Sequence, residues 1–204
     1  MGGRAGGGAS GGMGRGSRGS GGLSKRAEAL AQKYLGDVKN PELRRQLAEG
    51  LEAFDKEFGI PDRVTVTIKD LPSNTYGQIY TKSGRIEISS RFEDGRFGMG
   101  RAKHTMIHEL AHSIDKTLDK TIEFKGGRMM RKVKPENKVF DKKLMGAYKT
   151  FKLNYGSPAT KQIGGYALTK RTEFFAEAVA HHMTGTKNQY TTFAFNLAKS
   201  MTGK

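Results

Sequence analysis

The stretch GRAKHTMIHELAHSIDKTL at 100–118 contains the pattern HExxH, as HELAH at 108–112, among apolar residues that recur at helical spacing. Successive residues of an α-helix advance by about 100°, so His108 and His112 are expected about 40° apart and one turn along the axis. Both imidazoles could then reach one metal ion, and Glu109 could take a proton from water activated by that ion. The competing interpretation of this helix is an amphipathic segment with two surface histidines.

A third metal ligand has to come from another part of the chain, because a catalytic zinc site uses three protein ligands. A metzincin would have Gly and His where this chain has Asp115 and Leu118, so that family is excluded. The remaining downstream candidates are acidic residues and histidines: Glu123, Glu136, Glu173, Glu177, His181 and His182.

Two of these candidates stand out in the segment TEFFAEAVAHHM at 172–183. Glu173 and Glu177 are one helical turn apart there and have apolar neighbours, and carboxylates are seldom buried without a partner. One carboxylate could bind the metal, while the other could accept the free ring N–H of a histidine ligand. The competing interpretation is a solvated helix face. One of His181 and His182 could face the site, although neither is expected to be a ligand.

Taken together, HELAHSID at 108–115 and Y-x6-EFFAEA at 166–178 resemble the catalytic domain of anthrax lethal factor and its relatives, which are zinc endopeptidases of the gluzincin type. The resemblance covers roughly 100–183. It implies a zincin-like fold, a Zn²⁺ cofactor and hydrolysis of peptide bonds in a protein or peptide substrate. The zinc ligands that it implies are His108, His112 and Glu173.

The resemblance also implies roles for three further residues. Glu109 would be the general base, the hydroxyl of Tyr166 would assist at the developing oxyanion, and Glu177 would be the second carboxylate of the ExxxE pair. This chain departs from lethal factor in a longer spacing between the two motifs, which the basic segment 120–135 would account for. An exposed sheet edge within 76–90 would bind an extended peptide by strand addition, or would only cover the core.

The other patterns indicate an α+β fold. Helices are expected at 24–35, 40–58, 100–118, 135–153, 170–183 and 188–201; strands at 63–69, 76–82 and 85–90; and a loop or short hairpin at 120–135. We therefore expect one zincin-like domain over 23–204. It would contain a helical pair, a small antiparallel or mixed sheet, the metal-binding helix and a C-terminal helical subdomain. His104 lies one turn before His108 and could approach the site, but it is expected to be exposed or to cap a helix.

The amino-acid composition excludes every kind of site that depends on cysteine. The 204 residues include no Cys, which excludes disulfides, thiolate zinc fingers, iron–sulfur clusters and cysteine nucleophiles. No run approaches the roughly 20 apolar residues of a membrane span, and the start of the chain does not resemble a secretion signal. We expect a soluble protein without a membrane partner, cytoplasmic by default, with a phage virion or an exported effector as alternatives.

The charge balance suggests partners. Segment 1–22 is rich in Gly and Arg and is expected to be a disordered tail, while the chain as a whole has a formal charge of +16. A basic surface would attract acidic protein substrates or make weak contacts with nucleic acid. The competing hypothesis for the function is a basic nucleic-acid-associated or phage structural protein whose metal site is structural or inactive.

Overall fold

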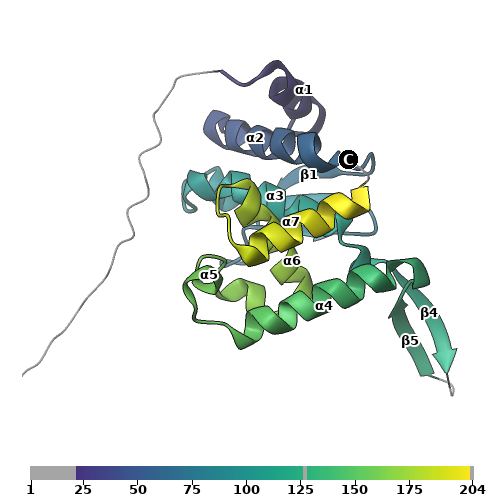
Figure 1. Ribbon diagram of the computed structural model, residues 1–204. Helices are drawn as coiled ribbons and strands as arrows, with labels where there is room; N and C mark the ends of the chain where they lie inside the picture. Colours follow the sequence, from purple (N-terminus) through teal and green to yellow (C-terminus); the bar gives the residue numbers. More distant parts are fainter. Residues whose placement is uncertain (1–21, 126–127, 203–204) are drawn as a thin grey trace, which may run out of the picture.

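The computed structural model describes residues 22–125 and 128–202, so the tail predicted at 1–22 lies outside it except for Gly22. The predicted α+β class is confirmed (Figure 1). The helices are α1 (Lys25–Tyr34), α2 (Pro41–Phe58), α3 (Ala102–Ile114), α4 (Lys138–Leu153), α5 (Pro158–Lys161), α6 (Arg171–Met183) and α7 (Gln189–Thr202). The strands are β1 (Thr65–Lys69), β2 (Gly77–Tyr80), β3 (Arg85–Ser89), β4 (Lys120–Lys125) and β5 (Arg128–Val133). Within the described ranges, every helix is too short or too polar to cross a membrane.

Local chemistry explains where the first two helices begin. The Ser24 side chain accepts a hydrogen bond from the backbone N–H of Ala27, and the Asn40 side chain accepts two from the first turn of α2. These bonds satisfy amide groups that have no partner inside the helix. Pro41 occupies the first helical position, where its missing N–H costs nothing.

The predicted helix at 100–118 is shorter in the structure, because α3 ends at Ile114. Asp115 adopts an extended backbone conformation, and its carboxylate accepts a hydrogen bond of 2.8 Å from the backbone N–H of Thr117. This bond begins a separate 3₁₀ turn, η3 (Lys116–Leu118). Asp115 therefore closes the helix instead of continuing it.

The main sheet is mixed and has the strand order β1-β3-β2. Strand β3 pairs in parallel with β1 and antiparallel with β2, which follows from the tight turn that joins β2 to β3. Gly84 in this turn has a φ of +77°, which a residue with a side chain rarely adopts. Of the antiparallel and mixed arrangements that the sequence left open, the mixed one is present, and β2 lies at an edge.

Helix α3 lies in the interior, packed between α2 and α6 (Figure 1). Ten of its 13 residues are buried. Gly50 on α2 permits the close approach, since a Cβ there would lie 3.0 Å from the backbone oxygen of Lys103. The fully buried side chains of α2 and α6 include large aliphatic and aromatic ones: Leu43, Leu47, Leu51, Phe54, Phe174 and Phe175. Because α3 is buried on nearly all sides, its polar residues need partners inside the protein.

The basic segment at 120–135 forms a hairpin rather than a loop. Strands β4 and β5 pair antiparallel, and Figure 1 shows them extending away from the helices. Ile122, Met129 and Met130 are exposed on this hairpin. The hairpin between the two sequence motifs therefore lies outside the packed helices, and α3 and α6 are in contact.

Candidate metal centre

The two HExxH histidines meet a carboxylate from α6 inside the protein. Nε2 of His108 lies 3.2 Å from Nε2 of His112, and Oε2 of Glu173 lies 3.3 Å and 3.2 Å from these two nitrogens. All three side chains are less than one-fifth exposed. The structure thus brings together three residues that are 4 and 61 positions apart in the chain.

This triangle of donor atoms fits a metal ion closely. Zinc bound at about 2.0–2.1 Å by tetrahedral ligands requires those ligands to be about 3.3–3.4 Å from one another. The three measured separations are 3.2, 3.2 and 3.3 Å. Two nitrogens and one oxygen are also a donor set that Zn²⁺ favours, and the cluster meets the geometric requirement for one ion.

Glu177 lies on the other side of His108. Its Oε1 is 3.3 Å from Nδ1 of His108, and its Oε2 accepts a hydrogen bond of 3.0 Å from Nε2 of His104. Burial alone would raise the pKa of Glu177, but these two histidines hold it well below its usual range. An ionised carboxylate at Nδ1 fixes which ring nitrogen carries the proton and leaves Nε2 free for a metal.

The same carboxylates control the charge of His108 when no metal is bound. Burial acts to lower the pKa of this imidazole, but Glu173 and Glu177 outweigh it and raise the pKa to about 10. The pKa of Glu173 is held well below its usual range, because its contacts with the two histidines outweigh burial. In the metal-free protein, a proton on His108 therefore balances part of the buried negative charge.

Glu109 follows His108 and is buried at the wall of the cleft. Burial raises the pKa of its carboxyl group, although His108 and His112 act in the opposite direction. The backbone of Gly77, at the start of β2, passes directly over it. A Cβ at Gly77 would lie 3.1 Å from Oε1 of Glu109 and 2.9 Å from Cγ2 of Thr105. Gly77 therefore permits a close approach that the sequence analysis did not predict.

Tyr166 belongs to a 3₁₀ turn, η5 (Gly165–Leu168), that precedes α6. Its ring centroid lies 6.0 Å from that of His108, and 58% of the residue is exposed. Burial of its hydroxyl end and the negative charge of Glu173 and Glu109 raise the pKa of Tyr166 to about 12. The phenol thus keeps its proton at neutral pH and can donate a hydrogen bond into the cleft.

The prediction that His104 would be exposed or would cap a helix is wrong. His104 is half-buried and lies one turn before His108, with Glu177 as its partner. His181 also reaches Glu177, at 3.6 Å, whereas His182 turns away and stacks on Phe195 at 4.2 Å between ring centroids. The sequence indicates these positions through its spacing: His104 and His108 are four residues apart, as are Glu177 and His181, so each pair shares one face of its helix.

A cleft of about 800 Å³ runs over these residues. Its walls come from the loop before β2, from α3, from η5 and from α6. The acidic, imidazole and phenol side chains that line it are Tyr76, His104, His108, Glu109, Tyr166, Glu177 and His181. Such a volume matches the clefts in which proteins hold small ligands and short peptide segments.

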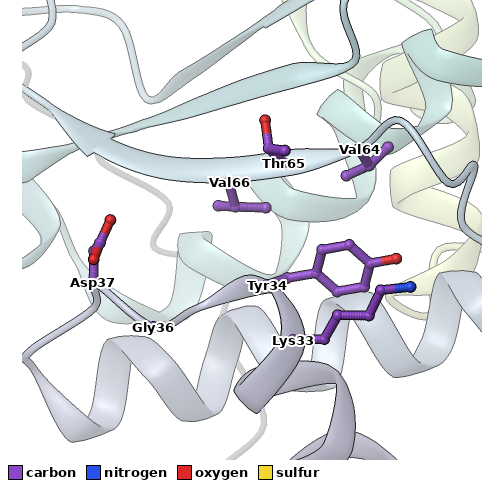
Figure 2. Close-up of a pocket in the computed structure, with 7 residues that line it drawn as sticks. All are labelled: Lys33, Tyr34, Gly36, Asp37, Val64, Thr65 and Val66. Atoms are coloured by element: carbon purple, nitrogen blue, oxygen red, sulfur yellow. The ribbon is translucent and has the colours of Figure 1, made fainter.

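A second hollow of about 280 Å³ lies between the end of α1 and β1 (Figure 2). Figure 2 shows Lys33 and Tyr34 at one end and Asp37 at the other, with Val66 between them. Among the described residues, the clusters of possible metal ligands lie on α3 and α6 and not at this hollow. We found no family model, curated protein or solved structure that matches this chain.

Proposed function

We propose that this protein is a zinc-dependent endopeptidase with a lethal-factor-like zincin architecture of the gluzincin type. The observation that carries the proposal is the triangle of donor atoms from His108, His112 and Glu173. One of its members, His108, lines a large cleft together with the buried Glu109. A metal with three protein ligands keeps a position open for water or substrate, which distinguishes catalytic from structural zinc sites.

The residues around the triangle suit peptide hydrolysis. When bound, Zn²⁺ supplies Lewis acidity, which acidifies water and polarises a carbonyl group. Glu109 lies next to His108 and faces the cleft, so it takes the proton of the attacking water and later delivers it to the leaving amine. Burial raises the pKa of the Glu109 carboxyl group, which makes its carboxylate a stronger base for the proton of the attacking water.

Tyr166 and Glu177 have the two remaining roles in the proposed hydrolysis. The phenol of Tyr166 donates a hydrogen bond to the oxyanion that develops on the substrate carbonyl, since its pKa of about 12 keeps it protonated. Glu177 holds the His108 ring by its Nδ1 side. Tyr166 is therefore assigned a catalytic role, and Glu177 a positioning role.

Strand β2 offers a place for the substrate. It is the edge of the sheet next to the cleft, and no strand among the described residues pairs with its other side. An extended peptide added there would pass beside Gly77 and so beside Glu109. The excess of basic residues in the chain favours acidic substrates.

Cleavage of an unfolded protein by the zinc-loaded chain tests the proposal, with Glu109→Gln as the critical variant. The amide cannot act as a base, so we expect kcat/KM to fall about 10²–10⁴-fold while the zinc content is unchanged. Glu136→Gln is the matched control, because Glu136 is exposed on the turn before α4. We expect it to retain full activity and metal.

The same measurement separates the enzyme from the competing hypothesis of a basic structural protein. If the wild type and Glu109→Gln retain zinc and cleave equally, the cleavage comes from a contaminant and the enzyme assignment is wrong. If Glu173→Gln binds zinc as tightly as the wild type, the ligand assignment is wrong.

A further inference from the structure

A second cluster of metal-binding side chains lies on the same two helices, one turn away from the first. His104 precedes His108 by one turn on α3, and His181 follows Glu177 by one turn on α6. Oε2 of Glu177 lies 3.0 Å from Nε2 of His104 and 3.6 Å from Nε2 of His181. The two imidazole rings meet edge to face, with 4.6 Å between their centroids.

We propose that His104, Glu177 and His181 form a second divalent-cation site that binds Zn²⁺. Two imidazole nitrogens and a carboxylate oxygen that all lie within 4.8 Å of one another can reach a single ion after small side-chain rotations. We call this cluster the outer site, and His108, His112 and Glu173 the inner site. The binding of an ion at the outer site does not depend on the proposed peptidase activity.

The outer site is open to water on one side. His104, Glu177 and His181 all line the cleft, and about a quarter of each imidazole side chain is exposed. Water can therefore fill the remaining coordination positions of a bound ion. Greater exposure than at the inner site also means a weaker hold, because bulk water competes and the ligands are less constrained.

Glu177 couples the two sites. Its Oε2 belongs to the outer cluster, while its Oε1 lies 3.3 Å from Nδ1 of His108, an inner-site residue. An ion on Oε2 withdraws charge from the carboxylate and so weakens its hold on His108. Two positive ions on neighbouring helical turns also repel each other. We therefore expect the outer ion to bind second and more weakly.

Counting bound ions tests the proposal. The metal-free full-length chain is titrated with Zn²⁺ up to millimolar concentration, and the stoichiometry is read by calorimetry and native mass spectrometry. We expect two ions for the wild type and one ion for His181→Asn and for His104→Asn, which alter different helices. His182→Asn is the matched control: it removes the neighbouring histidine, which stacks on Phe195, and should leave two ions. Circular dichroism verifies that each variant is folded.

The outcomes for the two sites are distinguishable, because His112→Asn disables only the inner site. If the wild type binds one ion that survives in His181→Asn and is lost in His112→Asn, the outer site does not exist. If His181→Asn and His104→Asn still bind two ions, the assignment of these ligands is wrong. If a single ion is lost in His181→Asn but kept in His112→Asn, the outer site stands and the inner zinc site of the proposed function fails.

Discussion

Nε2 of His108 lies 3.2 Å from Nε2 of His112 across one turn of α3, and both rings are buried. Two unprotonated ring nitrogens at this distance point their lone pairs at each other, which is unfavourable unless a positive charge lies between or beside them. In the metal-free protein a proton on His108 provides this positive charge, because Glu173 and Glu177 raise the pKa of His108 to about 10. A metal ion bound between the two ring nitrogens would provide the same positive charge.

Zinc binding should therefore release a proton from His108 across the physiological range. Below a pKa of about 10 the metal must displace this proton, so the apparent zinc affinity rises with pH, by about tenfold per unit between about pH 7 and 8.5. Glu173 adds no proton, since its pKa is held well below its usual range. Competition with a chelator of known affinity measures the slope. An affinity that does not change with pH would contradict a protonated His108.

Gly77→Ala should impair catalysis without removing the metal. The new methyl group would lie 2.9 Å from Cγ2 of Thr105, a β-branched side chain with little freedom in a helix, and 3.1 Å from Oε1 of Glu109. Displacement of Glu109 or of β2 should lower kcat/KM by about 10²-fold at unchanged zinc stoichiometry. Gly146→Ala on α4, where a Cβ meets open space, is the control and should remain fully active. Full activity of Gly77→Ala would remove the argument for a tightly placed Glu109.

Tyr166→Phe should lower kcat about 10²–10³-fold and leave zinc affinity unchanged, because it deletes one hydrogen-bond donor to the oxyanion. The comparison is Tyr34→Phe, which removes a phenol at the smaller hollow (Figure 2) and should have no effect on turnover. Steady-state kinetics on a fluorogenic peptide would show the difference. A change in KM alone would indicate that Tyr166 binds substrate without assisting the reaction.

Phe174→Ala should destabilise the fold and the metal site together. Phe174 is fully buried next to Glu173, and its ring centroid lies 4.9 Å from that of Phe151. We expect the free energy of unfolding in urea to fall by about 3–5 kcal/mol. Leu153→Ala, at a residue that is 86% exposed, should change it by less than about 0.5 kcal/mol. Equal stability of the two variants would show that α6 is not anchored by this aromatic packing.

The helices of the candidate site could be predicted because their geometry is local. The spacing of four between His108 and His112, and between Glu173 and Glu177, sets each pair on one face of its own helix whatever the rest of the chain does. The caps Ser24 and Asn40 likewise act within three residues. The α+β class follows from the order of these local patterns.

Some local interpretations were still wrong, because a neighbouring element changed the outcome. His104 looked like a surface residue, yet α6 brings Glu177 within 3.0 Å of it. The helix predicted to reach 118 ends at Ile114, because the Asp115 carboxylate bonds to Thr117 instead. Neither contact can be derived from the periodicity of apolar residues.

The sequence by itself determined which residues share a helical turn, and therefore which imidazoles and carboxylates could act in pairs. Only the tertiary structure decided that α3 and α6 meet, that Gly77 passes over Glu109, and that His104 and His181 converge on Glu177. Relations within a turn are set by the covalent geometry of the helix. Contacts between elements depend on how buried faces pack against one another, and a single helix does not encode its partner.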